Sequence, residues 1–231
     1  MKRILFLDNA VADDTYNAAR YWKPLLVYPH DMFHVALGEC PADINDYSHI
    51  LTTGSSASVL DDADWVRSEV ELIRNAVSKG KVILGSCFGH QLIARSLFGL
   101  DAVRKRQTPE IGWPDIEIMA DDALLGKADR IINGFVFHYD EVCRLPEDRA
   151  TLIARSSACD ILGFKLIDKP VWGIQPHFEM GIVEGLNYLD MVSGEHIPAR
   201  QSFFKNDAML PKDPGRIAPL MKAFHDASPL D

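Results

Sequence analysis

One short stretch of this chain constrains its fold more than any other. Residues 85–91 read Gly-Ser-Cys-Phe-Gly-His-Gln, follow an apolar run at residues 82–84 and lead into another apolar stretch. This order predicts a strand, a sharp turn and a helix, with Cys87 on the turn. Gly85 and Gly89 stand two positions to either side of Cys87, and small residues there let the strand and helix pass close together, as in the elbow that carries a nucleophile.

Cys87 is the first candidate for chemistry. On this turn it would lie at the N-terminus of a helix, where unpaired amide groups and the positive end of the helix dipole favour the thiolate, the attacking form of cysteine. A buried structural cysteine in a tight turn is the alternative. The flanking glycines and the polar pair His90 and Gln91 favour a reactive cysteine, because a packed core needs neither.

Composition excludes several classes of protein. With 231 residues, 47% of them hydrophobic, we expect one large core and one domain, residues 1–231. The formal charge of −9 argues against nucleic acid or an anionic membrane surface as the main partner. Four cysteines without C-x-x-C spacing predict a reducing compartment and no metal site. No apolar run has the length of a secretory signal or a membrane span, so we expect a cytoplasmic protein.

The first half of the chain alternates strand and helix. Strands are expected at residues 4–7, 33–37, 48–52 and 82–84, and helices at residues 13–22, 66–77 and 92–98. Asp61 and Asp62 offer a cap before the second helix, and Gly80 a stop after it. Such alternation predicts an α/β fold, a doubly wound and mostly parallel sheet with helices on both faces. Ligands bind at the carboxyl ends of such strands, so the turn at Gly54 and Ser55 should lie near Cys87.

The second half is richer in strands. They are expected at residues 115–119, 134–142, 151–156, 161–167 and 171–174, which predicts a partly antiparallel continuation of the sheet. Helices follow at residues 181–190 and 217–224, joined by an irregular surface connection at residues 196–215. The basic run at residues 104–106 is expected to be a solvated loop and not an anion site.

A histidine and a carboxylate complete the candidate chemistry. Residues 175–179 read Gln-Pro-His-Phe-Glu, and in extended backbone His177 and Glu179 point to the same side, so the carboxylate could orient the imidazole. Cys87, His177 and Glu179 are the parts of an activated thiol nucleophile. His138, in a second polar segment, is expected to be a surface histidine or one whose hydrogen bonds are satisfied.

Residues 85–91 and 175–179, about 90 residues apart, together resemble a class I glutamine amidotransferase domain, especially the glutaminase part of GMP synthase and its stand-alone relatives. The resemblance covers roughly residues 45–190, which leaves a helical tail at about residues 196–231. It implies a flavodoxin-like sheet. It also implies Cys87 as nucleophile, His177 as its base and Glu179 as the residue that orients His177.

The resemblance extends to substrate-binding positions. The oxyanion site of the family matches Gly54, Ser55 and the amide of Phe88, and its glutamine-binding residues match Gln91 and residues 137–140, which include His138 and Tyr139. Two positions depart from the family pattern: Phe178 replaces the proline of His-Pro-Glu, and Gly54-Ser55-Ser56 replaces a Gly-Gly-Pro turn. Neither departure removes a reacting group. A residue other than glycine at position 55 restricts how that peptide can flip.

The activity that the resemblance implies is hydrolysis of a γ-glutamyl amide through a thioester on Cys87, releasing ammonia and glutamate without a cofactor. No phosphate-binding loop of the form G-x-x-x-x-G-K-S/T is present in these residues, so a synthetase that used the ammonia would be a separate chain. Two alternatives stay open: a hydrolase of γ-glutamyl peptides or conjugates with the same triad, and a non-catalytic binding or regulatory protein on the same fold.

Overall fold

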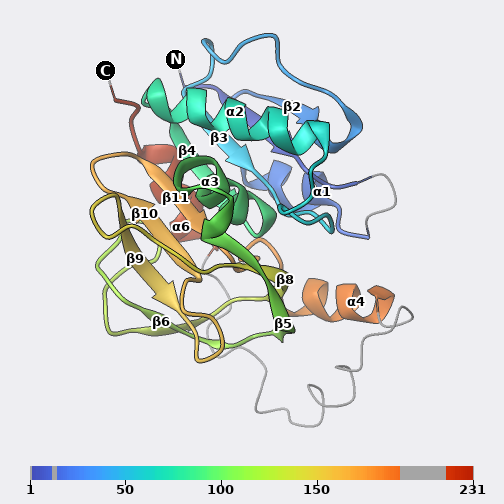
Figure 1. Ribbon diagram of the computed structural model, residues 1–231, viewed down its shortest axis with the longest axis vertical. Coiled ribbons are helices and arrows are strands. Elements are labelled where there is room, and N and C mark those ends of the chain that lie inside the picture. Colours follow the sequence, from blue (N-terminus) through green and yellow to red (C-terminus); the bar gives the residue numbers. More distant parts are fainter. Residues whose placement is uncertain (1, 12–14, 193–216, 231) are drawn as a thin grey trace.

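The computed structural model describes residues 2–11, 15–192 and 217–230 (Figure 1). Its strands are β1 (Ile4–Asp8), β2 (His30–His34), β3 (His49–Thr52), β4 (Val82–Ser86), β5 (Val103–Gly112), β6 (Asp115–Ile118), β7 (Ile131–Asn133), β8 (Val136–Val142), β9 (Ala150–Arg155), β10 (Gly163–Leu166) and β11 (Val171–Ile174). Its α-helices are α1 (Ala18–Trp22), α2 (Asp64–Ser78), α3 (Phe88–Phe98), α4 (Ile182–Val192) and α6 (Ile217–Asp226). The short 3-10 helices are η1 (Lys23–Leu25), η2 (Val35–Leu37) and η3 (Leu100–Ala102).

One sheet of nine strands runs through the molecule in the order β2-β1-β3-β4-β11-β10-β9-β6-β7, and β5 pairs separately with β8. Strands β2, β1, β3, β4 and β11 pair in parallel, and the rest of the sheet is antiparallel. The predicted parallel core with an antiparallel extension is confirmed. Because β3, β4 and β11 are parallel neighbours, their carboxyl ends meet at one edge of the sheet.

Both faces of the sheet are covered, and β1 shows how. Its residues alternate, with Ile4 and Phe6 in the core under α1 and α6, and Leu5 and Leu7 in the core under α2 and α3. All four side chains are fully buried. A strand sends alternate side chains to opposite faces, so an apolar run of this length requires helices on both sides.

Three boundaries differ from the sequence prediction. The second strand is β2 at His30–His34, and the residues predicted as strand end in the 3-10 helix η2. Helix α2 begins at Asp64 after Ala63, which makes no side-chain cap, so the predicted cap at Asp61 and Asp62 is wrong. Helix α1 is shorter than predicted and is capped by Asn17, whose side chain accepts from the amide of Arg20; residues 12–14 lie outside the described residues.

The basic run predicted as a solvated loop lies in β5. Its Arg104 and Arg106 both pair with Glu141 on β8, and Lys105 between them lines a cavity. A paired strand therefore replaces the predicted loop, because the cross-strand carboxylate neutralises the two arginines.

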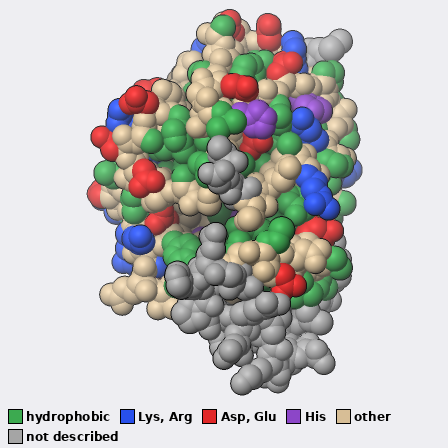
Figure 2. All heavy atoms as spheres, turned by 90° about the vertical axis from the view of Figure 1, so that its right-hand side faces the viewer, with side chains coloured by type: hydrophobic (Ala, Val, Ile, Leu, Met, Phe, Trp, Pro, Cys, Tyr) green, Lys and Arg blue, Asp and Glu red, His purple; other side chains and the backbone are tan. Residues whose placement is uncertain are grey.

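Surface charge is dispersed on the face shown in Figure 2, where acidic, basic and hydrophobic side chains of the described residues are interspersed. None of the described helices combines the length and apolar character needed to cross a membrane. The connection predicted at residues 196–215 lies outside the described residues, and the tail helix is present as α6.

Candidate active site

Cys87 lies on a strained turn between β4 and α3. Its backbone has φ 52° and ψ −107°, a conformation that residues with a side chain rarely adopt. The predicted close approach of strand and helix is confirmed: a Cβ atom added to Gly85 would lie 2.5 Å from the carbonyl oxygen of Gly89, and one added to Gly89 would lie 2.3 Å from that of Thr52. The amide of Cys87 donates to Ile174 on β11, which ties the turn to the neighbouring strand.

His177 meets Cys87 at the carboxyl edge of the sheet, beside Gly54. A Cβ atom added to Gly54 would lie 2.8 Å from Cε1 of His177 and 3.5 Å from Cβ of Cys87. Cys87 and His177 are both about 5% exposed, and both line one cavity. Gly54, Cys87 and His177 follow β3, β4 and β11, so the parallel strands bring together residues that are far apart in the sequence.

Glu179 holds the imidazole from behind. Nδ1 of His177 lies 2.6 Å from Oε1 of Glu179. The sequence predicts this pair from extended backbone, but the segment forms a turn in which the amide of Met180 donates to the carbonyl of His177 at 3.2 Å. The turn, and not strand periodicity, brings the carboxylate to the ring.

The electrostatics of His177 follow from these neighbours. Burial by itself lowers the pKa of an imidazole, but the charges of Cys87 and Glu179 and their hydrogen bonds outweigh it and raise the pKa of His177 well above its ordinary value. The ring therefore keeps a second proton at neutral pH. A protonated ring beside the sulfur favours the thiolate form of Cys87 by direct attraction.

Tyr16 is a member of the site that sequence reasoning missed. Its hydroxyl donates to Oε1 of Glu179 at 2.7 Å and accepts from Nε1 of Trp22 at 3.0 Å, and its ring packs edge-on against His177. Burial and the adjacent carboxylate raise the pKa of Tyr16 well above its usual value, so the hydroxyl keeps its proton for donation. No motif surrounds Tyr16 in the sequence, and only the fold brings it beside residues about 160 positions away.

The turn after β3 supplies amides near the sulfur. The amide of Gly89 is bonded to the carbonyl of Thr53, and that of Cys87 to the carbonyl of Ile174. Within the described residues, the amides of Ser55 and Phe88 make no backbone hydrogen bond. These two amides are the ones that the resemblance assigns to an oxyanion site.

A buried polar network lies under this turn and was also missed. Asn9 donates through its side-chain amide to the hydroxyl of Thr52 at 2.9 Å and to the carbonyl of Thr53 at 3.2 Å. Thr52 in turn donates to Oε1 of Glu69, on α2, at 2.8 Å. Glu69 is 1% exposed, and burial raises its pKa to about 7. The network connects a helix on one face of the sheet to the strand end that carries Gly54.

The cavity beside Cys87 has a volume of about 260 Å³. Of the residues predicted from sequence, it is lined by Ser55, Cys87, Gln91, His138, Tyr139 and His177. Gly54, Phe88 and Glu179 lie directly behind that lining through the contacts described above. The side-chain amide of Gln91 donates to the carbonyl of Asp140 at 2.8 Å and to Oε1 of Gln175 at 3.0 Å, so it braces the cavity wall.

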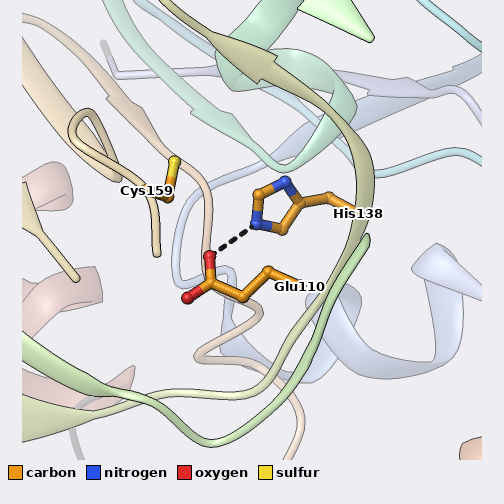
Figure 3. A group of neighbouring side chains, drawn as sticks. All are labelled: Glu110, His138 and Cys159. Carbon is orange, nitrogen blue, oxygen red and sulfur yellow. Dashed lines mark hydrogen bonds and ion pairs between the residues drawn. The ribbon is translucent and has the colours of Figure 1, made fainter. Parts of the chain in front are cut away.

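His138 is buried and its hydrogen bonds are satisfied. Nδ1 lies 2.8 Å from the carbonyl oxygen of Asp140, and Nε2 lies 3.0 Å from Oε2 of Glu110 (Figure 3). Burial works to raise the pKa of Glu110, but the bonds from His138 and Ser156 outweigh it and the pKa is lowered. Both ring nitrogens are thus engaged by protein atoms.

Glu110, His138 and Cys159 are also a group that could offer ligand atoms to a metal, with those atoms within 4.8 Å of one another. Figure 3 shows Cys159 to one side of the bond between His138 and Glu110. Burial raises the pKa of Cys159 to about 12, so its thiol keeps its proton at neutral pH. The hydrogen bonds account for the geometry of this group as a buried ion pair that fixes β8 against β5.

A polar corner of the cavity combines a cation and an anion that sequence reasoning did not single out as a pair. Ser58 donates from its hydroxyl to Oδ2 of Asp140, and Lys105 lines the same cavity. Burial raises the pKa of Asp140 above its ordinary value. Asp140 falls within the segment that the resemblance assigns to glutamine binding, whereas no local pattern distinguishes Lys105 from the two arginines beside it.

Comparison with known proteins agrees with this geometry. The family model for glutamine amidotransferase class I matches residues 26–188. Gamma-glutamyl peptidase 4 of Arabidopsis thaliana is 33% identical over 181 residues, which cover 75% of this chain and 70% of that protein. The glutaminase component of the glutamine-hydrolyzing GMP synthase of Methanothermobacter thermautotrophicus is 37% identical over 98 residues, 42% of this chain and about half, 51%, of that protein.

Solved structures share the fold. A glutamine amidotransferase from Thermotoga maritima has a TM-score of 0.72 at 20% identity and covers 97% of this chain and 94% of its own. Another from Methylobacillus flagellatus has a TM-score of 0.74 at 22% identity, covering 97% of this chain and 91% of its own. On the match of the family model over most of its length, this chain belongs to the class I glutamine amidotransferase family.

Proposed function

We propose that the protein hydrolyses γ-glutamyl amides through a thioester on Cys87, and that residues 1–231 act as one domain. The observation that carries the proposal is the meeting of Cys87 and His177 beside Gly54, with Glu179 behind the imidazole. A sulfur, a protonated imidazole and an orienting carboxylate are what acyl transfer to a thiol requires. A protein that only binds a ligand has no need of this arrangement.

The first half of the reaction forms the thioester. The thiolate of Cys87 adds to the γ-carbonyl carbon of the substrate, and the carbonyl oxygen becomes an oxyanion held by the amides of Ser55 and Phe88. Each such donor is worth about 3 kcal/mol in acyl transfer. The intermediate collapses as the carbon–nitrogen bond breaks, and His177 gives its proton to the departing amine.

The second half releases glutamate. His177, now neutral, takes a proton from a water molecule that adds to the thioester, and the carbon–sulfur bond breaks to restore the thiolate of Cys87 and the protonated ring. Glu179 stabilises the charge on the imidazole in both halves, and Tyr16 fixes the carboxylate through its hydroxyl. One water is consumed, and one glutamate and one amine are formed.

Recognition of the glutamyl group falls to the polar corner of the cavity. The α-carboxylate of the substrate would pair with Lys105 and its α-amino group with Asp140, which Ser58 and Gln91 hold in position. His138 and Tyr139, on the same strand, would position this wall.

Two leaving groups fit the same chemistry. An amine, as in a γ-glutamyl peptide or conjugate, is favoured by the similarity to gamma-glutamyl peptidase 4, which extends over 75% of this chain. Ammonia from glutamine is the second candidate, favoured by the similarity to the GMP synthase component. That candidate requires a separate synthetase as partner.

Glutamate release tests the proposal. Wild-type protein is incubated with glutamine, γ-glutamyl methylamide and γ-glutamyl p-nitroanilide, and Cys87→Ala should abolish release from whichever substrate is used. Cys40→Ala is the matched control, because Cys40 is exposed and lies outside the cavity. Undiminished turnover by Cys87→Ala would refute the mechanism. Failure of a glutamine-mimicking electrophile to label Cys87, with no glutamate from any substrate, would instead support a non-catalytic binding protein.

A further inference from the structure

Aromatic side chains form one wall of the active-site cavity. Phe135, Phe137 and Tyr139 occupy alternate positions just before and along β8, and Tyr188 reaches them from α4; all four line the cavity. Ring centroids are 5.3 Å apart for Phe137 and Tyr188, 5.8 Å for Phe137 and Tyr139, and 6.2 Å for Phe135 and Tyr188. Figure 1 shows α4 beside the β5–β8 pair. The rings therefore make a continuous surface.

This aromatic wall starts at the catalytic histidine. The ring of Phe135 lies 6.3 Å from that of His177, and the amide of His177 donates to the carbonyl of Phe135 at 2.7 Å. In the proposed reaction His177 protonates the leaving nitrogen. Whatever substituent that nitrogen carries must therefore pass along the neighbouring rings.

The two faces of β8 divide the cavity by chemistry. Alternate residues of a strand point to opposite faces. The rings occupy one set of positions, and the other set carries His138 and Asp140, which bond to Glu110 and Ser58. The charged glutamyl group thus has its own partners, and the aromatic wall is left for another part of the substrate.

The size of the cavity fits a substituent larger than ammonia. Its volume of about 260 Å³ exceeds the roughly 150 Å³ of a protein cavity that holds a benzene ring, while a water-sized molecule needs only about 30 Å³. Tyr139, at the far end of the wall, is 43% exposed. An exposed ring next to buried ones can cover a ligand at the entrance.

We propose that the aromatic wall, formed by Phe135, Phe137, Tyr139 and Tyr188, binds the leaving group, and that the substrates are γ-glutamyl amides of amines that carry an aromatic ring. This inference rests on the proposed hydrolysis and adds the class of amine to it. Offset and edge-on packing against the four rings would select such a leaving group over a small or polar one.

The experiment compares matched substrates. The ratio of kcat/KM for the γ-glutamyl amide of phenethylamine to that for γ-glutamyl methylamide is measured by glutamate release. For wild-type protein this ratio should be about 10 to 100, the gain from burying one aromatic side chain. Because it is taken within one protein sample, a ratio is insensitive to partial loss of folded enzyme.

A pair of variants isolates the wall. Phe137→Ala should reduce the ratio by about 10-fold, since it removes the ring that contacts both Tyr139 and Tyr188. Phe33→Ala is the control, because Phe33 is a partly buried phenylalanine on β2, outside the cavity, and the ratio should stay at the wild-type value.

Three outcomes would overturn the inference. A ratio near one in wild-type protein, or faster release from γ-glutamylserine than from the phenethylamide, would remove the aromatic selectivity while leaving the proposed hydrolysis intact. A Phe137→Ala variant with an unchanged ratio would show that the wall does not provide the selectivity. Absence of glutamate from every amide would refute the proposed hydrolysis itself, and the leaving-group site with it.

Discussion

Replacing Glu69 by glutamine should change how stability depends on pH. Glu69 is buried on α2, and its Oε1 accepts from Thr52 and Asn9 while its Oε2 has no partner within the described residues. Burial raises its pKa from 4.5 to about 7. Folding therefore favours the protonated carboxyl, because an unpaired negative charge is costly in the interior.

The sign and size follow from this shift. Since the folded-state pKa exceeds the unfolded-state value, the stabilisation is fully present below pH 4.5 and is lost as pH rises through about 7. Each pKa unit corresponds to about 1.4 kcal/mol, so the contribution lost over this window is about 3 kcal/mol. Glutamine cannot ionise, and its amide oxygen can still accept from Thr52. Relative to wild type, Glu69→Gln should gain about 3 kcal/mol between pH 4.5 and pH 7.5.

Urea unfolding followed by tryptophan fluorescence measures this difference at several pH values. Glu71→Gln is the control, because Glu71 is exposed on the same helix and paired with Arg74, so its substitution should leave the pH dependence of wild type. If the stability curves of wild type and Glu69→Gln run parallel from pH 4.5 to 7.5, the assigned burial energy of Glu69 is wrong.

Three further predictions concern the site. Tyr16→Phe removes a hydroxyl that donates to Glu179, and steady-state kinetics should show kcat about 10- to 100-fold lower with little change in KM; an unchanged kcat would remove Tyr16 from the positioning of the carboxylate. Gly89→Ala places a methyl 2.3 Å from a carbonyl oxygen of β3 and should lower the free energy of unfolding by about 3 kcal/mol or more, measured by thermal unfolding. Ser58→Ala frees Asp140 and should raise KM about 10-fold with kcat nearly unchanged; a fall in kcat alone would contradict its assignment to binding.

Local sequence predicts the nucleophile turn well, because the requirements of the turn are local. The approach of Gly85 to Gly89 and the positive φ of Cys87 are properties of a few consecutive residues. The sequence also predicts the bond between His177 and Glu179, but from extended backbone, whereas the structure forms it through a turn. Spacing alone therefore gives the correct pair for an incorrect reason.

What sequence reasoning missed depends on pairing between distant segments. Lys105 falls in a run predicted to be solvated, because nothing nearby in the sequence shows that Glu141 on β8 neutralises the arginines on either side. Tyr16 and Glu69 carry no motif, and their partners are reached only once β1, β3 and β11 lie in one sheet. The motifs suggest a match from about residue 45, while the family model begins at residue 26, since β2 carries no recognisable signature.

The hydrogen bond between the amide of His177 and the carbonyl of Phe135 makes the proton donor and the first ring of the wall one mechanical unit. An engineer who reshapes the wall at Phe135 to accept a different amine would also displace the backbone that carries the imidazole. Redesign of selectivity without loss of turnover should therefore begin at Phe137 and Tyr139, which lie farther along the strand and have no such bond to the imidazole segment among the described residues.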